Sequence, residues 1–441
     1  MATYKNLRKV LNLPTLSESP SSGVNGEMYF NTTDSALHIY DGVWKKATQS
    51  ELPLPDWTAT TQQAKIVASD AQADDLFGNQ VAIDGNTLVV AAYGEDTGGS
   101  FAGAAYVFTR SGTSWSQQAK LVASDAQAND RFGTSVAIAG DTVAVGAYWE
   151  ATGGSMAGAA YVFTRSGTSW SQQAKIQSSD VAADDMFGNS VAIEGDTLVV
   201  GASYEDTGGT NAGSTYVFTR SGTTWSQQAK IQSSDIQAYD QFGHSVAIAS
   251  DTLVVAAYEE DTGGDRTGSA YVFTRSGTSW SQQAKIQSSD VQAYDFFGID
   301  VGISGDTIIV GCANEDTGGS GAGSAYIFTR SGTSWSQQAK IQSSDVQAAD
   351  SFGNSVGITG DTIIVAARYE DTGASNAGSV YVFTRSGTSW TQAKKIQASD
   401  AQASDFFGED IAIAGKTVVV GATGEDTGGS DAGSAYTFIA G

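Results

Sequence analysis

A tandem repeat makes up most of this chain and restricts the folds open to it. The dipeptide Phe-Gly occurs seven times at intervals of 55 residues, beginning at Phe77, Phe132, Phe187, Phe242, Phe297, Phe352 and Phe407. The run Tyr-Val/Ile-Phe-Thr-Arg recurs at the same interval from Tyr106 to Tyr381, and a degraded copy begins at Tyr436. No copy contains an insertion. A fixed period of this length predicts one supersecondary unit per copy, with a core shared between neighbouring units.

Each copy has the pattern of four short strands. In the third copy we expect strands at Ser190–Ile193, Thr197–Ala202, Ser214–Arg220 and Trp225–Ile231. Gly-Asp and Ser-Gly-Thr turns close two hairpins, and a glycine-rich loop joins the second strand to the third. No 3.6-residue periodicity appears, which excludes a helical repeat. A β-helix is the alternative, but its coils are shorter and lack paired hairpin turns. The sequence therefore predicts an all-β, seven-bladed β-propeller with four antiparallel strands per blade.

The two ends of the array predict how the ring closes. A fourth-type strand, Gln62–Val67, precedes the first Phe-Gly, and the array ends on a third-type strand, Ala435–Ile439. We expect the N-terminal strand to complete the last blade, because closure removes the two edges that an open array would expose. Trp57 departs from the repeat, three residues before the matching position, which Thr60 occupies. The predicted domains are a propeller at 57–441 and a separate segment at 1–56.

The repeated motif SVAIxGDTxVVGA followed by AGSAYVFTRSGTSWSQQAKI resembles a known family. It is similar to FG-GAP repeats, the seven-bladed propeller modules of bacterial surface proteins and of integrin alpha subunits. The resemblance covers roughly residues 57–441. The Asp-x-Asp-x-Asp-Gly calcium loops of integrin blades are absent here, so the resemblance does not imply calcium dependence.

Residues 1–56 lack the repeat. Two predicted strands, separated by the polar turn Asn31–Ser35, carry an aromatic face of Tyr29, Phe30, Tyr40 and Trp44. The pattern resembles the NGxxYFNTTxxxLxxYDGxxW hairpin of tail-fibre and other virion structural proteins of bacteriophages. That resemblance implies an anchor that docks on a particle through the four aromatic side chains. A small hairpin packed on the propeller is the open alternative.

The charge balance limits the classes of partner. The chain has 48 acidic and 23 basic residues, which gives a net charge of −25, so phosphate backbones should repel it and nucleic acid is not an expected partner. No apolar run approaches the ~20 residues that span a bilayer, and the first residues lack the apolar core of a secretion signal. The single cysteine, Cys312, falls in a buried strand pattern, where an inert packing role is expected.

Strand order assigns the loops to two rims. The fourth-to-first and second-to-third connections share one acid-rich rim, where Arg131, Arg266 and Arg368 are the basic residues, and the hairpin turns share the other. Each copy has an aspartate two residues before Phe-Gly and another five residues earlier. The favoured interpretation is that these aspartates cap loop amides. The alternative is Ca²⁺ binding by clustered oxygens, with these candidate ligands: Asp70, Asp75, Asp180, Asp185, Asp290 and Asp295.

Signs of an enzyme are weak. A catalytic site needs a few groups with distinct roles, whereas these carboxylates repeat symmetrically. His38 and His244 have no nucleophile motif beside them. The repeated aromatic residues are expected in the core. Trp149 has no counterpart in other copies and follows a strand on the acid-rich rim, so we expect an exposed ring that can stack on a saccharide.

Together these features predict a non-enzymatic virion structural or adhesion protein, such as a phage tail fibre, spike or decoration protein. Residues 1–50 would bind other proteins of the virion or surface assembly. The propeller would bind a glycan or protein of the host surface, without membrane insertion. The expected location is the virion. The alternatives are a bacterial cell-surface adhesin of the FG-GAP type and, third, a propeller enzyme acting on polysaccharide.

Overall fold

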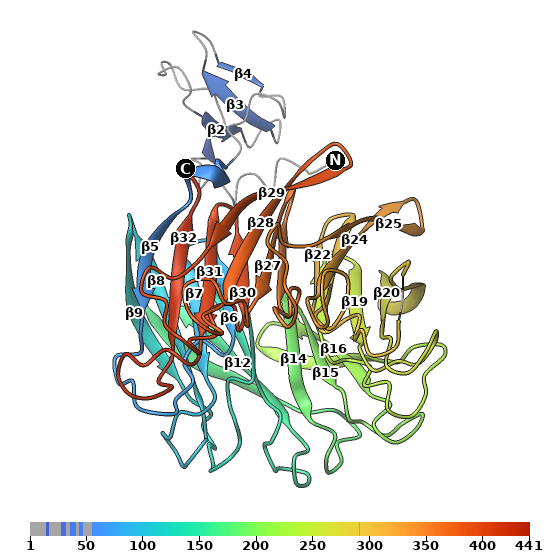
Figure 1. Ribbon diagram of the computed structural model, residues 1–441. Helices are drawn as coiled ribbons and strands as arrows, with labels where there is room; N and C mark the ends of the chain where they lie inside the picture. Colours follow the sequence, from blue (N-terminus) through green and yellow to red (C-terminus); the bar gives the residue numbers. More distant parts are fainter. Residues whose placement is uncertain (1–14, 17–27, 32–35, 41–43, 47–54, 291) are drawn as a thin grey trace.

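The computed structural model describes residues 15–16, 28–31, 36–40, 44–46, 55–290 and 292–441. Seven four-stranded antiparallel sheets stand around a common axis (Figure 1), which confirms the predicted seven-bladed propeller. Blades 1 to 6 follow one another in the chain, as β6–β9, β10–β13, β14–β17, β18–β21, β22–β25 and β26–β29. Blade 7 combines β30, β31 and β32 with β5 from the start of the propeller.

The strands have similar bounds in every blade. The first strands, which contact one another around the axis, are β6 Val81–Asp84, β10 Ser135–Ala139, β14 Phe187–Glu194, β18 Val246–Ala249, β22 Val301–Ser304, β26 Val356–Thr359 and β30 Ile411–Ala414. The second strands are β7 Thr87–Ala92, β11 Thr142–Ala147, β15 Thr197–Ala202, β19 Thr252–Ala257, β23 Thr307–Cys312, β27 Thr362–Ala367 and β31 Thr417–Ala422. The third strands are β8 Ala104–Ser111, β12 Ala159–Ser166, β16 Ser214–Ser221, β20 Ser269–Ser276, β24 Ser324–Ser331, β28 Ser379–Ser386 and β32 Ser434–Ile439. The outer strands are β9 Ser114–Leu121, β13 Ser169–Ile176, β17 Thr224–Ile231, β21 Ser279–Ile286, β25 Ser334–Ile341, β29 Ser389–Ile396 and β5 Thr61–Ile66.

The ring closes as the sequence predicts. Strand β5 pairs antiparallel with β32, with Ile66 opposite Ala435 and Thr61 opposite Ile439. Just before β5, the backbone amides and carbonyls of Asp56 and Gly441 bond to each other, at 3.3 and 3.1 Å between N and O. The first and last parts of the propeller are therefore joined in one sheet, and blade 7 has four strands like the other six.

The core lies between adjacent blades. The second strands are buried along their whole length, because both of their faces are covered by neighbouring sheets. The repeated phenylalanine fills the inter-blade space: Phe187 packs edge-on against Tyr216 and Phe218 of the same blade, with ring centres 5.5 and 6.0 Å apart. This confirms the core role expected for these aromatics. Cys312, at the end of β23, is also buried.

Steric contact explains the glycine of the Phe-Gly pair. Gly188 has φ +94°, and a Cβ there would lie 2.5 Å from the carbonyl oxygen of Ala159 in the preceding blade. The preceding blade contributes Gly158, where a Cβ would lie 2.1 Å from the carbonyl oxygen of Phe187. The amide of Phe187 bonds to the carbonyl of Ala157 at 3.0 Å. Two glycines thus let the backbones of adjacent blades touch, and the same contact recurs around the ring.

The propeller has two distinct rims. We call the rim formed by the fourth-to-first and second-to-third connections the loop rim, and the rim of two-residue turns the hairpin rim. The bonds between Asp56 and Gly441 lie at the hairpin rim, so the N-terminal segment joins the propeller there (Figure 1). In that segment β2 Met28–Asn31 pairs with β1 Thr15–Leu16 and β3 Ala36–Tyr40, and β3 also pairs with β4 Trp44–Lys46. Among the described residues, no helix has the length and apolar character to cross a membrane.

Candidate functional site

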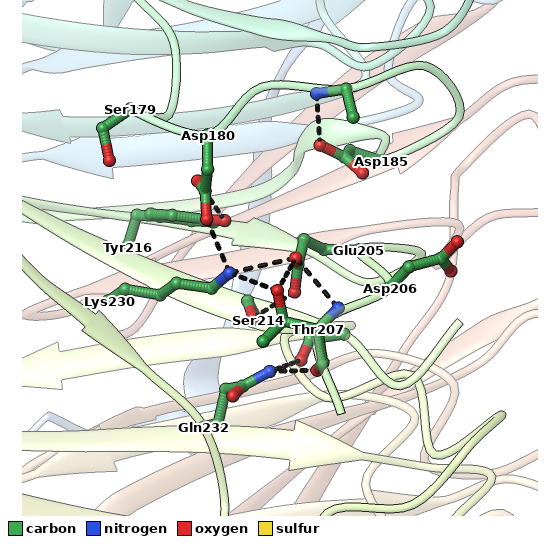
Figure 2. A network of polar contacts seen from close by, with 12 residues as sticks. Ser179, Asp180, Asp185, Glu205, Asp206, Thr207, Ser214, Tyr216, Lys230 and Gln232 are labelled. Carbon is green, nitrogen blue, oxygen red and sulfur yellow. Dashed lines mark hydrogen bonds and ion pairs between the residues drawn. The ribbon is translucent and has the colours of Figure 1, made fainter. Parts of the chain in front are cut away.

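The repeated acidic residues of the loop rim surround a lysine from the outer strand. In blade 3, the Lys230 ammonium lies 2.7 Å from an Asp180 oxygen and 2.9 Å from a Glu205 oxygen (Figure 2). It also donates to the Thr207 hydroxyl at 2.9 Å. The Tyr216 hydroxyl donates to the second Asp180 oxygen. One cation therefore holds two carboxylates from two different connections and ties both loops to the outer strand.

The lysine with its two carboxylates recurs in all seven blades, while the tyrosine bond to the aspartate occurs in four. The lysines are Lys65, Lys120, Lys175, Lys230, Lys285, Lys340 and Lys395. Burial alone would raise the pKa of Asp180, but hydrogen bonds from Lys230 and Tyr216 hold it below its usual range. The loop rim is thus less negative than its loop sequences indicate, because the lysines reach it from strands that a count of loop residues leaves out.

The aspartate two residues before each Phe-Gly has a different environment from the one that pairs with lysine. Asp185 is buried and accepts the backbone N–H of Ala182 at 2.7 Å. Burial, together with the nearby charge of Glu205, raises the pKa of Asp185 to about 6, against the bond from Ala182. The bond to an amide three residues earlier is the capping role that the sequence favoured for both repeated aspartates. That prediction holds for Asp185 but not for Asp180, whose bonds come from Lys230 and Tyr216.

The proposed calcium ligands all have partners within the chain. Asp70, Asp180 and Asp290 lie 2.7, 2.7 and 2.6 Å from a lysine ammonium. Asp75, Asp185 and Asp295 accept backbone amides at 2.7 to 2.9 Å. Within the described ranges, no group of three or more His, Cys, Asp or Glu side chains is arranged to hold a metal ion. The calcium hypothesis stays a prediction, and a bound ion would have to compete with the ammonium groups.

A cavity of about 440 Å³ opens where the axis of the ring meets the loop rim. We call it the channel mouth. Its wall comes from all seven blades, chiefly from the two residues that follow each Phe-Gly and from residues at the ends of second strands. Pockets of several hundred cubic ångströms accommodate small ligands.

The channel mouth is one of the places where the repeats differ. The residues that directly follow Phe-Gly are Asn79, Thr134, Asn189, His244, Ile299, Asn354 and Glu409. The next residues are Gln80, Ser135, Ser190, Ser245, Asp300, Ser355 and Asp410. The blade scaffold needs Phe and Gly at fixed positions, yet it accepts many side chains immediately beside them. Part of this set serves the scaffold, since Asn79, Asn189 and Asn354 each donate to a backbone carbonyl of the next blade. The copies with other residues at that position change the wall of the cavity without changing the blade. Comparing the copies position by position would have marked these positions as variable, and the fold shows that they meet in one cavity.

One half of the channel mouth is acidic. The Ser355 hydroxyl lies 3.3 Å from Asp300 and 3.0 Å from Asp410, so it joins the two carboxyl groups. Each also accepts a backbone amide, from Val356 and Val81 respectively. Burial raises the pKa of Asp300 to about 6. Burial and the charge of Asp300 raise the pKa of Asp410 to about 7.

The other half is aromatic. Tyr148, Tyr204 and Tyr258 line it from three consecutive blades. The His244 ring lies against Tyr258, with ring centres 4.1 Å apart. Burial lowers the pKa of His244 to about 4, so this imidazole is neutral at neutral pH. His244 lies in the loop before β18, and the structure places this loop residue in the wall of the cavity.

Trp149 differs from its prediction. The expected exposed ring is half-buried, and the Arg131 guanidinium carbon lies 3.6 Å from the ring centre. Arg131 also donates to the Tyr148 hydroxyl at 2.7 Å. Arg131 and Trp149 occur at their repeat positions in blade 2 alone. The guanidinium stacks on one face of the indole, so less of the ring is open to a saccharide. Saccharide stacking on Trp149 is not tested and stays a prediction.

The proposed anchor residues are placed only as backbone. Tyr29 and Phe30 belong to β2, Tyr40 to β3 and Trp44 to β4. Their side chains, and the polar turn at 32–35, lie outside the described part of the chain. The docking role of these four residues stays a prediction.

Comparison with known proteins identifies the repeat. The model of the FG-GAP repeat matches residues 60–108, 115–163, 170–218, 225–273, 280–328, 335–383 and 390–438. Each match begins near the end of one blade and includes the first three strands of the next. No curated protein matches the chain significantly.

Proposed function

The chain belongs to the FG-GAP repeat family, and from this we propose that it is a non-enzymatic attachment protein of a bacteriophage particle. In this proposal it serves as a tail-fibre, spike or decoration protein. Residues 1–50 hold it to other virion proteins, and the loop rim contacts a glycan or protein of the host surface. The virion assignment rests on the resemblance of residues 26–44 to virion hairpins.

The polarity of the ring carries the proposal. The N-terminal segment joins the propeller at the hairpin rim, beside Asp56 and Gly441. The channel mouth, where the repeats differ, lies at the opposite rim. A protein attached through one rim would present the other outward. This arrangement suits a molecule that is fixed at one end and binds a target at the other.

A binding role fits the chemistry of the loop rim. Its repeated carboxylates are held by lysines and backbone amides in the same way in blade after blade, so the repeated carboxylates single out no blade as a catalytic centre. We therefore rank a polysaccharide-active enzyme below attachment. Prolonged incubation of the purified protein with bacterial polysaccharides should release no reducing ends, and release would reverse this ranking.

Truncation tests the attachment role. Residues 51–441 retain the closing strand β5 and every blade, so this fragment should fold, with a circular dichroism spectrum typical of β-sheet. It should fail to join particles in a complementation experiment, while a full-length Asp410→Asn variant should join them normally. If the fragment is incorporated as efficiently as the full chain, attachment runs through the blades. If no particle contains the full chain, the bacterial surface adhesin becomes the better proposal.

A further inference from the structure

We propose that the channel mouth binds a positively charged, polyhydroxylated ligand, an amino sugar with a free ammonium group. This deepens the proposed function by naming the class of ligand. The experiment below uses the purified protein without particles, so its failure leaves the attachment proposal standing.

The acidic half of the channel mouth provides uncompensated negative charge. Asp300 and Asp410 receive hydrogen bonds from neutral donors alone: Ser245, Ser355 and backbone amides. By contrast, the adjacent Glu409 is neutralised by Arg368, at 2.9 Å. Two carboxylates joined by one hydroxyl repel each other when both are ionised. A ligand ammonium between them would relieve that repulsion.

The aromatic half favours the same kind of ligand. Tyr148, Tyr204 and Tyr258 contribute aromatic rings to its wall. Aromatic faces attract cations and also stack on the apolar faces of sugar rings. Because His244 is neutral, it does not oppose a cation. The Arg131 guanidinium bonds to Tyr148, so a cation is favoured beside Tyr204 and Tyr258, at the two blades farther from that arginine.

The remaining wall indicates hydroxyl groups on the ligand. It is formed mainly by hydroxyl and amide side chains: Gln80, Asn189, Ser190, Ser203, Gln241 and Asn354. Asn189 and Asn354 already bond to backbone groups of the chain. The side chains of Gln80, Ser203 and Gln241 remain to pair with hydroxyls of a sugar, which the aliphatic stem of a lysine could not offer them. A volume of about 440 Å³ suits a mono- or disaccharide rather than a bare metal ion.

Calorimetric titration of the full chain at pH 7 tests this proposal. Glucosamine should bind, and N-acetylglucosamine, which lacks the charge, should bind at least about tenfold more weakly. Asp300→Asn and Asp410→Asn should each weaken glucosamine binding by about tenfold or more, since each removes one charge and keeps a side-chain acceptor for the backbone amide. Tyr204→Ala, a change at a half-exposed position, should weaken binding without affecting folding. Asp265→Asn, which removes an exposed charge elsewhere on the loop rim, is the matched control and should bind as the wild type does.

The dependence on pH adds a second readout. The charged and titratable groups at the acidic half are Asp300, Asp410 and the Glu409–Arg368 pair. Across the cavity are His244, the three tyrosines and the Arg131 guanidinium that bonds to Tyr148. As pH falls from 7 to 5, protonation of the two aspartates should weaken glucosamine binding, and Asp410→Asn should reduce this change.

Four results would overturn the proposal. Equal affinity for N-acetylglucosamine would show that charge plays no part. Binding of Nα-acetyl-lysine amide in preference to glucosamine would replace the sugar by a protein side chain. Calcium binding that is lost in both aspartate variants and unaffected by Tyr204→Ala would make the channel mouth a metal site. Absence of glucosamine binding up to its solubility limit would exclude this ligand class.

Discussion

At the scale of single residues, most charges on the loop rim serve the scaffold. Lys230 joins Asp180 to Glu205, and Glu205 has almost no exposure to solvent. The sequence predicted the acidic residues of this rim but not their lysine partners. The reason is geometric: the lysine belongs to an outer strand, and only the folded blade shows that its long side chain ends among the loops.

The lysine network should be a strong contributor to stability. Lys230→Met removes the ammonium and leaves the buried Glu205 carboxylate without its cation, which should lower the free energy of unfolding by about 3 kcal/mol. Arg266→Met, which removes a half-exposed cation 3.6 Å from Glu259 on the same rim, should cost less than about 1 kcal/mol. Urea denaturation of both variants compares them. Equal losses would mean that the lysine network is no stronger than an exposed ion pair.

The residues of the channel mouth were harder to predict. Asp300 and Asp410 occupy a position that is serine in four other copies, so they stood out only in a comparison of the copies. Their pairing across Ser355 depends on the curvature of the ring, which brings blades 5, 6 and 7 to one cavity. The sequence shows that these two copies have aspartate where others have serine, but only the folded ring shows that the two carboxyl groups bond to the same hydroxyl.

At the scale of elements, blade 7 is fastened to blade 6 differently from the other blades. The sequence showed that Trp57 is out of register with the repeat but not what it contacts. In six blades an arginine joins neighbouring blades, as Arg220 does by donating to Thr142 of the preceding blade at 2.9 Å. Blade 7 has Ala440 in place of that arginine. The Trp57 indole instead donates to Thr362 at 3.2 Å, the threonine that the missing arginine would contact. The displaced tryptophan therefore fastens the closing strand.

Trp57 should accordingly be a weak point for ring closure. Trp57→Ala removes a fully buried ring between blades 6 and 7 and should lower the free energy of unfolding by about 3 to 4 kcal/mol. Trp57→Phe keeps part of the packing and loses the bond to Thr362, at a smaller cost, because only one hydrogen bond and some contact area are lost. Thermal denaturation provides the comparison. If Trp57→Ala melts with the wild type, closure does not depend on this residue.

The four-strand pattern itself was predictable. The predicted bounds of the second strand in the third copy are those of β15, while β14 begins at Phe187, three residues before the predicted Ser190. The difference comes from an irregular pairing in which Phe187 lies opposite Ala202 before regular pairing resumes at Val191. Alternation of side chains cannot reveal such an irregularity, because alternation breaks there.

At the scale of the whole molecule, two families of aspartates make stability depend on pH. Burial raises the pKa of Asp75, Asp185 and Asp295 to about 6 and that of Asp240 to about 7. Since the folded state then binds more protons than the unfolded state between about pH 4 and 7, stability should fall as pH rises through this range. Aspartates paired with lysine, such as Asp180, have lowered pKa values, and their contribution is lost below about pH 4.

The protein should therefore be most stable near pH 5, despite the usual preference for neutral conditions. Its melting temperature should be higher at pH 5.5 than at pH 8 at constant ionic strength. Asp240→Asn, which keeps an acceptor for the Gln237 amide and removes the buried charge, should raise stability at pH 8 by roughly 1 kcal/mol and reduce the slope. A melting temperature that rises steadily from pH 5.5 to pH 8 would contradict these shifts.

The orientation of the propeller on a particle tests the central claim most directly. We propose that residues 1–50 attach the molecule at its hairpin rim and that the channel mouth faces outward. Electron cryomicroscopy of intact particles, at a resolution that separates the two rims, would measure this orientation. The account predicts ring-shaped density whose hairpin rim, at Asp56 and Gly441, faces the particle, with the cavity beside Asp300 and Asp410 open to solvent. A propeller whose loop rim lies against the particle would contradict it.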